Sequence, residues 1–246
     1  MFSSLARLSS VEDGDFQSVS LGSDSVDNRQ AAIAKLRQAC RSEVQMSKAP
    51  PLPTGFAVID ESLGGGLPRG QIVEAVGKVG RLSLALSVLA KATQQKETAV
   101  FIDGADALDP GGAMAQGIDL RRLLWARVKN GNSALRAADL TLGAGGVSLI
   151  VLYLVGVADA QQLVRAALWS RLQHRAQRAK AALLVVTEKP LAQSFAVATL
   201  GFVDDGMRWQ AAPGGRLQLC ARQARIEVLR SRLGAPGDVQ PFCLAR

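Results

Sequence analysis

Two short apolar runs and the segment between them define the first pattern in this chain. Residues 71–76 and 98–102 are rich in β-branched side chains, which is typical of buried strands. Residues 82–92 carry apolar side chains at helical spacing, so the pattern predicts a strand, a helix and a second strand. The turn before the helix contains Gly77 and Gly80, where backbone N–H groups and a helix N-terminus can converge on an anion.

The pattern continues as an alternation of helices and strands, which favours an α/β fold. Residues 147–155 are continuously apolar, as expected of a parallel strand buried on both faces. The other expected elements are a short strand at 124–127, a helix from Asn132 or Ser133 toward Leu142, a helical segment at 159–180 and a strand at 182–188.

The last part of the chain has a different pattern. Residues 207–244 alternate apolar and polar side chains around a turn at Pro213, Gly214 and Gly215. This alternation predicts an antiparallel hairpin and sheet edge. The sequence therefore predicts a mostly parallel central sheet that ends in antiparallel strands.

The N-terminal part divides into two predicted segments before a core domain at 54–246. Residues 1–28 are poor in apolar side chains and carry five acids against Arg7 alone, so we expect a disordered acidic tail. Residues 29–53 hold a predicted helix, which extends to about residue 46, and a Pro-rich linker. The sequence leaves two alternatives for this helix: it packs on its own core, or it packs on a neighbouring subunit.

Residues on both sides of the first strand resemble RecA-type recombinases. Thr54, Gly55, Asp60, residues 63–68 and Gly70 match the family's segment before the nucleotide loop. After the loop, Phe101, Ile102, Asp103 and residues 107–110 match the family's "FIDAEHALDP" segment. The resemblance implies a three-layer RecA-like core across residues 52–244, in which ATP would bind at the turn after the first strand.

The nucleotide loop departs from the family's pattern. A Walker A loop has four residues between its glycines, followed by a Lys and a hydroxyl residue that hold phosphates and Mg²⁺. Here only Lys78 and Val79 separate Gly77 from Gly80, so the loop is two residues shorter. Arg81 stands at the Lys position, and the next residue, Leu82, cannot ligate a metal.

Other positions that the resemblance assigns to ATP hydrolysis are also replaced. The strand at 149–152 leads into Tyr153 in place of the Asp that would orient Mg²⁺. The family's catalytic Glu falls at Ala105, and Glu188 stands where the recombinases have a Gln that senses the γ-phosphate. We therefore predict no ATP hydrolysis, no bound nucleotide cofactor and no metal.

Among RecA-like proteins, the chain most resembles the ImuA family of bacterial mutasome cassettes. The matching residues are 52–55, Asp60, 63–70 and Glu74, followed by the altered loop. This resemblance implies a role in damage-induced (SOS) mutagenesis and error-prone translesion DNA synthesis. It implies as partners ImuB, an inactive Y-family-like polymerase, and RecA, with an error-prone replicative-type polymerase as an indirect partner.

Charge and composition limit the remaining possibilities. The formal net charge is +8 and the isoelectric point is about 9.9, which favours polyanions or acidic proteins as partners. Cys40, Cys220 and Cys243 are far apart and fit neither a disulfide framework nor a zinc site. Because no apolar run is long enough to span a bilayer and the N-terminus lacks a secretory pattern, we predict a cytoplasmic protein without membrane contact.

Two basic segments are the candidate binding surfaces. In residues 159–180, an apolar face is formed by Leu163, Ala167, Leu168 and Leu172, and a basic face by Arg165, Arg171, His174, Arg175, Arg178 and Lys180. In the C-terminal part, basic side chains line the predicted hairpin at Arg216, Arg222, Arg225, Arg230 and Arg232. Solvated basic faces, contact with DNA phosphates and contact with an acidic protein surface are the alternatives. The segment at 190–200 is short and apolar where recombinases have a long DNA-binding loop, which argues against strand exchange.

Three hypotheses of function follow. The first is a non-catalytic accessory factor that keeps the RecA-like core as a platform for protein contacts, and that restrains RecA filaments. The second is a DNA-binding module whose basic segments contact backbone phosphates. The third is an ATPase with an altered loop, against which Arg81, Tyr153 and Ala105 all argue.

Overall fold

The computed structural model describes residues 49–163, 166–211, 216–233 and 242–245. They belong to one compact unit, Glu43–Arg246. The predicted tail at 1–28 and the predicted helix before residue 47 lie outside the described residues.

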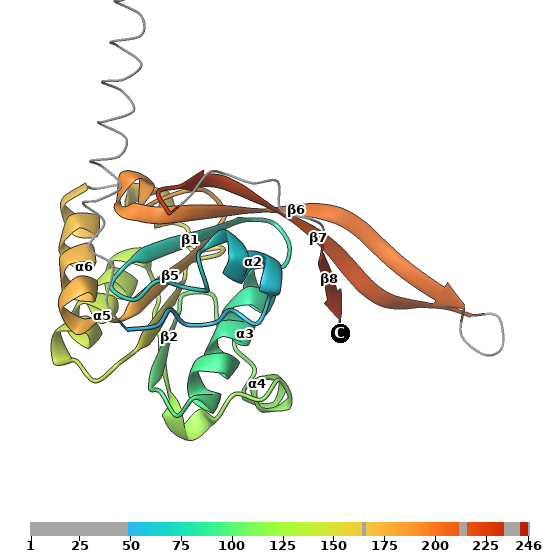
Figure 1. The fold of residues 1–246 in the computed structure, drawn as a ribbon, viewed down its shortest axis with the longest axis horizontal. Coiled ribbons are helices and arrows are strands. Elements are labelled where there is room, and N and C mark those ends of the chain that lie inside the picture. The colour runs from blue at the N-terminus through green and yellow to red at the C-terminus, as the bar shows by residue number, and fades with distance from the viewer. Residues whose placement is uncertain (1–48, 164–165, 212–215, 234–241, 246) are drawn as a thin grey trace, which may run out of the picture. The chain divides into compact units, whose positions relative to one another are not determined.

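Within the described residues, the core is an eight-stranded sheet in the order β3-β2-β4-β5-β1-β6-β7-β8 (Figure 1). The strands are β1 (Ile72–Gly77), β2 (Ala99–Asp103), β3 (Leu123–Arg127), β4 (Leu149–Tyr153), β5 (Ala182–Thr187), β6 (Ala196–Ala211), β7 (Leu217–Ser231) and β8 (Phe242–Ala245). The helices are α2 (Ala57–Ser62), α3 (Arg81–Gln94), α4 (Pro110–Ala115), α5 (Gly131–Ala144) and α6 (Ala166–Ala179), with 3-10 turns η1 (Leu120–Arg122), η2 (Ala160–Leu163) and η3 (Gln193–Phe195).

The strand directions confirm the predicted sheet. All pairs from β3 to β6 are parallel, whereas β7 is antiparallel to β6 and β8 is antiparallel to β7. Because every parallel strand ends at the same edge, the turns after β1, β2, β4 and β5 meet there. That edge is where an α/β protein normally places its ligand site.

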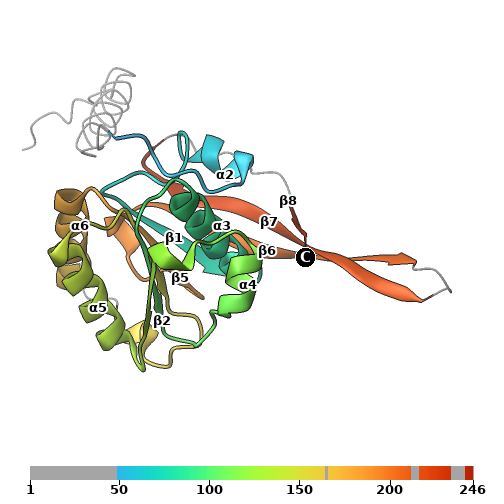
Figure 2. The ribbon, with the colours of Figure 1, turned by 90° about the horizontal axis from the view of Figure 1, so that it is seen from below.

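Helices cover both faces of the sheet, and the side chains of β4 show why. Leu149, Val151 and Tyr153 pack in one apolar cluster, which includes Leu84 and other residues of α3. The alternate residues, Ile150 and Leu152, pack in the second cluster with residues of α5 and α6. Since successive side chains of a strand point to opposite faces, a continuously apolar strand requires a layer on each side (Figures 1 and 2). The three-layer prediction is confirmed.

The segment before β1 is held by contacts between its own motif residues. Asp60 Oδ1 accepts hydrogen bonds from the backbone N–H of Thr54 at 2.8 Å and from its hydroxyl at 2.7 Å. Leu52 and Leu67 exchange two backbone hydrogen bonds of 2.9 and 2.7 Å. Gly66 has a φ of +130°, and a side chain there would overlap the backbone of Leu52. These contacts between motif residues thus fix the conformation of the chain before β1.

The start of α5 corrects one sequence-based prediction. The helix was predicted to open at Asn132 or Ser133, but its N-cap is Asn130, whose side chain accepts a hydrogen bond from the Ser133 N–H at 2.8 Å. Asn130 is a favourable cap because it satisfies an N–H group that has no partner within the helix. The helix itself is confirmed.

The predicted segment at 159–180 also differs in detail, because η2 and α6 are separate elements. Leu163 belongs to a 3-10 turn, which has fewer residues per turn than an α-helix, so α-helical spacing does not relate it to Ala167 in α6. Ala167 is exposed, and the fully buried residue is Trp169, whose indole N–H donates to the carbonyl of Leu163 at 2.8 Å. The expected apolar face is therefore correct for Leu163 and Leu172 but wrong for Ala167.

A long antiparallel ribbon confirms the predicted C-terminal hairpin. β6 pairs with β1 only as far as Phe202, whereas its pairing with β7 continues to Ala211. Beyond the sheet, the two strands form the ribbon that extends to the right in Figure 1. Residues 196–200, expected to belong to a loop, are instead strand, because they pair in parallel with β1. No helix in the described part of the chain has the length and hydropathy to cross a bilayer.

Candidate functional site

A short turn joins β1 to α3 at the carboxyl edge of the sheet. Lys78, Val79 and Gly80 are its connecting residues, and α3 begins at Arg81. Gly80 adopts a left-handed conformation, with φ 83° and ψ −14°, and no side chain caps the helix. Lys78 is exposed, whereas Val79 is buried. The chain therefore passes from strand to helix through only three connecting residues.

Gly77 is explained by the neighbouring strand. Its φ is +126°, and it pairs with Phe202 of β6. A side chain at this position would overlap the Phe202 carbonyl group, and the Lys78 N–H donates to the same carbonyl oxygen at 3.4 Å. Close strand packing is thus sufficient reason for a glycine here.

The side chain of Arg81 is buried in the turn. Its Nη1 donates to the carbonyl oxygen of Thr187 at 2.6 Å, and its Nη2 donates to the carbonyl oxygen of Lys78 at 3.3 Å. Only 7 % of the residue is exposed. Burial lowers the pKa of its guanidinium, and the nearby Tyr153 and Glu188 oppose that shift. Arg81 therefore connects the first turn of α3 to the end of β5.

A hollow of about 240 Å³ lies beside the end of β5. Thr187 and Glu188 line it together with residues from the 154–160 turn. Glu188 is the one charged residue among those that line it, and it is exposed. A carboxylate at this position repels a phosphate group.

Tyr153 ends β4 at the same edge. The residue is 7 % exposed, and its ring stacks on Phe101 with centroids 5.8 Å apart. Burial raises the pKa of the Tyr153 hydroxyl, Arg81 opposes the shift and Asp103 adds to it. A buried, protonated phenol contributes no negative charge for a metal ion.

Asp103 is an acid at the end of β2, but its carboxylate oxygens already accept hydrogen bonds from the protein. It is 1 % exposed and accepts hydrogen bonds from the backbone N–H groups of Ala105, Ala107 and Leu108 at 3.0–3.1 Å. The indole N–H of Trp125 donates to it at 3.2 Å. Asp103 thus holds the turn after β2, in which Ala105 offers no acid or base.

Glu74 is a second buried acid, which sequence reasoning used only as a motif match. It lies in the middle of β1 with 0 % exposure. Its Oε1 accepts from the N–H groups of Leu191 and Ala192 at 2.7 and 2.6 Å, and Thr199 donates to Oε2 at 3.3 Å. Burial raises the pKa of Glu74, partly opposed by these hydrogen bonds and by Arg230. Glu74 therefore fixes the segment that follows β5.

The basic face of α6 is partly neutralised by α5. Arg171 donates to the carboxylate of Asp139 at 2.8 and 2.6 Å, and Arg175 approaches the same carboxylate at 2.8 Å. Arg175 also donates to the Asp139 carbonyl oxygen at 2.9 Å. His174, Arg178 and Lys180 are exposed, and no ion pair is formed by them with the described residues. Arg165 lies outside the described residues.

The C-terminal arginines contact the chain itself. Arg230 donates to the carbonyl oxygens of Gln193 and Ala196, and Arg232 donates to Ala196 at 3.4 Å. Arg225 pairs with Glu227 at 3.5 Å, where both side chains are about half exposed. The backbone of Arg222 pairs with Met207 and Leu244, but its side chain lies outside the described residues.

The structure thus brings part of the predicted site together. Gly77, Lys78, Gly80 and Arg81 form one turn, while the described basic residues fall into two separate regions, one in and directly after α6 and the other in and directly after β7. Sequence reasoning missed the acceptor role of Thr187 and the partner role of Asp139. Neither has a local signal, because Thr187 is 106 residues from Arg81 and Asp139 is 32 residues from Arg171.

Comparisons with known proteins agree with this architecture. The chain is 38 % identical to protein RecA of a Picosynechococcus species over 123 residues, which is 49 % of this chain and 34 % of that protein. It is 38 % identical to protein RecA of Saccharopolyspora erythraea over 124 residues, covering 49 % and 34 % of the two chains. With protein RecA of Fusobacterium nucleatum the identity is 42 % over 104 residues, covering 41 % and 28 %.

These matches span about a third of the length of the relatives. The family model of the RecA N-terminal domain matches residues 15–183, which is more than half of the chain. It includes β1, the turn at Gly77, α3 and the strands as far as the start of β5. By this match, the chain belongs to the RecA family.

Proposed function

We propose that this RecA-family chain is an accessory protein that does not hydrolyse ATP and acts through protein contacts. Its role is that of the ImuA family, in damage-induced mutagenesis and translesion DNA synthesis in the cytoplasm. Its partners are an ImuB-like inactive polymerase and RecA, whose filaments it restrains, and it reaches the error-prone replicative-type polymerase indirectly. The resemblance at 52–55, Asp60 and 63–70 supports these partners.

The bond between Arg81 and Thr187 is the observation that carries the proposal. A residue at the Walker A Lys position has to extend toward phosphates. Arg81 instead directs its guanidinium into the protein, where it donates to the Thr187 carbonyl at 2.6 Å. The guanidinium therefore stabilises the fold and is not available to bind a phosphate, because breaking a buried, charge-assisted hydrogen bond costs free energy.

The other groups around the turn do not fit ATP with Mg²⁺. The turn has too few residues between Gly77 and Gly80 to wrap phosphates. Leu82 follows in place of a hydroxyl, and the strand that would supply a metal-orienting acid ends in the buried Tyr153. Glu188 adds a negative charge at the edge of the nearby hollow. We infer that neither nucleotide nor metal is needed for the protein's function.

Two measurements on the purified full chain test this proposal. Phosphate release with ATP, with and without single-stranded DNA, is expected at background level. Pull-down with an ImuB-like partner is expected to succeed equally with and without ATP, and binding to preformed RecA filaments is expected to slow RecA's own ATP turnover. ATP hydrolysis by the chain, or binding to neither partner, would contradict the proposal.

A DNA-binding module is the second candidate, and the exposed cations of α6 favour it. Arg178, His174 and Lys180 are exposed side chains on or beside one helix face, and the chain as a whole carries a charge of +8. Such a face binds phosphates without sequence preference and in a salt-sensitive way. Retention on duplex DNA that Arg178→Glu abolishes, with no binding to either protein partner, would favour this candidate over protein contacts.

A further inference from the structure

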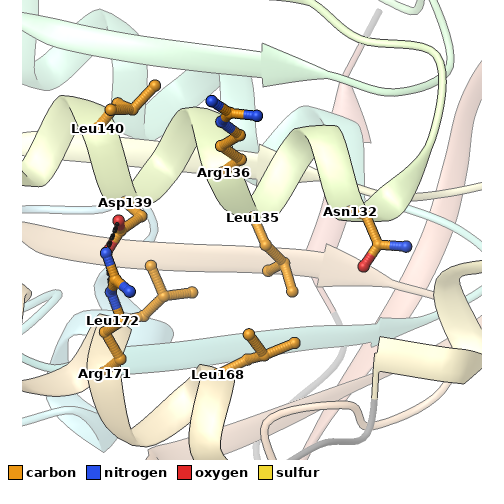
Figure 3. Close-up of a pocket in the computed structure, with 8 residues that line it drawn as sticks. All are labelled: Asn132, Leu135, Arg136, Asp139, Leu140, Leu168, Arg171 and Leu172. Atoms are coloured by element: carbon orange, nitrogen blue, oxygen red, sulfur yellow. Dashed lines mark hydrogen bonds and ion pairs between the residues drawn. The ribbon is translucent and has the colours of Figure 1, made fainter.

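A hollow of about 430 Å³ lies between α5 and α6, outside the turn at the carboxyl edge of the sheet. Figure 3 shows Leu135 extending from α5 toward α6, and Leu168 and Leu172 extending from α6 toward α5. Leu135 and Leu172 are buried, and Leu168 is partly buried. Three leucines from two helices thus form the apolar floor of a hollow whose volume lies in the range of small-molecule sites.

One end of this hollow is closed by an ion pair, and its rim is basic. Asp139 and Arg171 meet at 2.6 Å, as the dashed line in Figure 3 shows. Arg136 lines the hollow and is exposed. Leu140, which also lines it, is 62 % exposed. The one acid that lines it, Asp139, is already paired with two arginines.

A second hollow of about 650 Å³ adjoins the first, because Arg171 lines both. It is lined by Arg175, Arg178 and His174, and no acid is among the described residues that line it. An apolar groove is therefore continued by a surface whose described side chains are neutral or basic. We call the two hollows together the α5–α6 groove.

We propose that the α5–α6 groove binds an acidic amphipathic helix of a protein partner. A helix places apolar side chains at i, i+3, i+4 and i+7 along one stripe, which suits the floor formed by Leu135, Leu168 and Leu172. Acidic side chains beside that stripe complement Arg136 at the first hollow and Arg178 at the second. The proposal rests on the proposed function, because it assigns a surface and a chemistry to the partner contact.

The same observations disfavour nucleic acid as the occupant. Phosphates gain nothing from a floor of leucines, and Asp139 takes up part of the charge of Arg171 and Arg175. Among the described residues, no aromatic side chain lines either hollow, so bases find no ring on which to stack there. Exposed Leu140 at the rim offers apolar area that a protein partner can cover and that a phosphate backbone cannot use.

A library of displayed 14-residue helical peptides, panned on the full chain, tests the proposal. The expected selection is enriched in Glu and Asp and carries Leu or Phe at helical spacing. Peptides recovered in this way are then measured by fluorescence anisotropy against Arg136→Glu and Leu140→Glu. Each substitution introduces a negative charge at an exposed position, so the fold is retained. We expect affinity to fall about tenfold or more for each variant.

Matched controls are available away from the groove. Lys91→Glu makes the same charge change as Arg136→Glu at an exposed position of α3, which packs on the other face of the sheet from α5 and α6. Leu124→Glu replaces a leucine that is 55 % exposed in β3. Both variants should keep full affinity. Circular dichroism and thermal melting of all four variants confirm that they are folded.

Three results would overturn the proposal. The first is a selection without acidic helical peptides, or peptides that bind Arg136→Glu and Leu140→Glu as tightly as the unchanged chain. The second is displacement of the peptide by a 20-base-pair duplex at micromolar concentration, which would assign the groove to nucleic acid. The third is a change from dimer to monomer in Leu140→Glu by sedimentation, which would assign it to a second copy.

The outcome is separable from that of the proposed function. Pull-down with the ImuB-like partner and RecA uses the same Arg136→Glu and Leu140→Glu variants. If both variants retain partner binding, the groove assignment is wrong while the accessory function stands. If the unchanged chain binds neither partner, the proposed function itself is wrong.

Discussion

The guanidinium of Arg81 donates a 2.6 Å hydrogen bond to the carbonyl oxygen of Thr187, across the carboxyl edge of the sheet. The donor is the first residue of α3, and the acceptor is the last residue of β5. A positive charge is unfavourable at a helix N-terminus, where the helix dipole is itself positive. The bond to Thr187 offsets that cost, so this contact belongs to the stability of the turn.

Arg81→Ala should therefore destabilise the protein. It leaves the buried Thr187 carbonyl without this donor, and we expect the free energy of unfolding to fall by about 1–3 kcal/mol. Lys78→Ala in the same turn is the control, because Lys78 is exposed and its loss should change stability by less than about 0.5 kcal/mol. Urea denaturation followed by circular dichroism measures both. Equal stability of the two variants would show that the Arg81 contact is not maintained in solution.

The double variant Arg81→Lys, Leu82→Thr restores the residue types of a Walker A loop without restoring its length. Because only Lys78 and Val79 separate Gly77 from Gly80, the backbone still cannot wrap phosphates. We expect no ATP turnover above background and no saturable binding of a fluorescent ATP analogue. Measurable hydrolysis by the variant would mean that side-chain chemistry alone, and not loop length, disables the turn.

Asp103 is expected to contribute to stability and not to catalysis. Asp103→Ala removes the acceptor of three backbone N–H groups and of the Trp125 indole, so we expect a loss of about 3 kcal/mol or more in the free energy of unfolding. Asp106→Asn is the control, since its side chain is 69 % exposed and pairs only loosely with Arg127 at 3.5 Å. Asn also tolerates the left-handed backbone of this position, where φ is +53°. The effect of Asp106→Asn should stay below about 1 kcal/mol. Thermal melting of both variants shows whether the loss of stability is larger for Asp103→Ala than for the control.

Glu74 gives a pH-dependent prediction. Burial raises its pKa above the usual value of 4.5, so the folded protein holds this proton more tightly than the unfolded chain. The free energy of unfolding contributed by Glu74 therefore falls as the pH rises from about 4.5 through the raised folded pKa. Glu74→Gln does not titrate, and its amide oxygen can still accept from Leu191 and Ala192. Its stability relative to the unchanged protein should increase with pH across this window.

Glu74→Ala separates the charge from the hydrogen bonds. It leaves the buried N–H groups of Leu191 and Ala192 without their acceptor, at a cost of about 1–3 kcal/mol for each group. It should be destabilised at every pH, unlike Glu74→Gln. A flat difference between Glu74→Gln and the unchanged protein from pH 4 to 8 would contradict the raised pKa.

The sheet could be predicted from the sequence because its signals are local. The continuous apolar run around Leu149–Tyr153 requires helices on both faces, and the alternation in the sequence on either side of Pro213 predicts the pairing of β6 with β7. The start of α5 was misplaced because several polar residues near Asn130 can each cap a helix. Local patterns thus give the elements, while their ends depend on which of several similar residues is used.

The candidate site was harder to predict because its contacts join distant residues. The basic stripe of α6 appears free in the sequence, since no acid follows Asp159 within the segment. The acid that neutralises Arg171 comes from the preceding helix, and helical periodicity does not tell which faces of α5 and α6 meet. In the same way, the pattern places Asp103 at a strand end but does not show that four donors already use its carboxylate.

Asp139→Asn tests what the α6 cations do when they are released. Asp139 accepts from Arg171 and Arg175, and its side chain is 16 % exposed. An amide cannot balance two guanidinium charges, so we expect the free energy of unfolding to fall by about 1–2 kcal/mol. If α6 binds protein and not DNA, the freed charges should leave retention on duplex and single-stranded DNA nearly unchanged.

Asp106→Asn is the control for this test, because it makes the same change in net charge at an exposed acid away from α6. Filter binding over a range of salt concentrations compares the two variants. Each phosphate newly contacted by Arg171 or Arg175 would steepen the dependence of log K on log salt by nearly one. A steeper slope for Asp139→Asn than for Asp106→Asn would therefore identify α6 as a phosphate-binding face and favour the DNA-binding function over protein contacts.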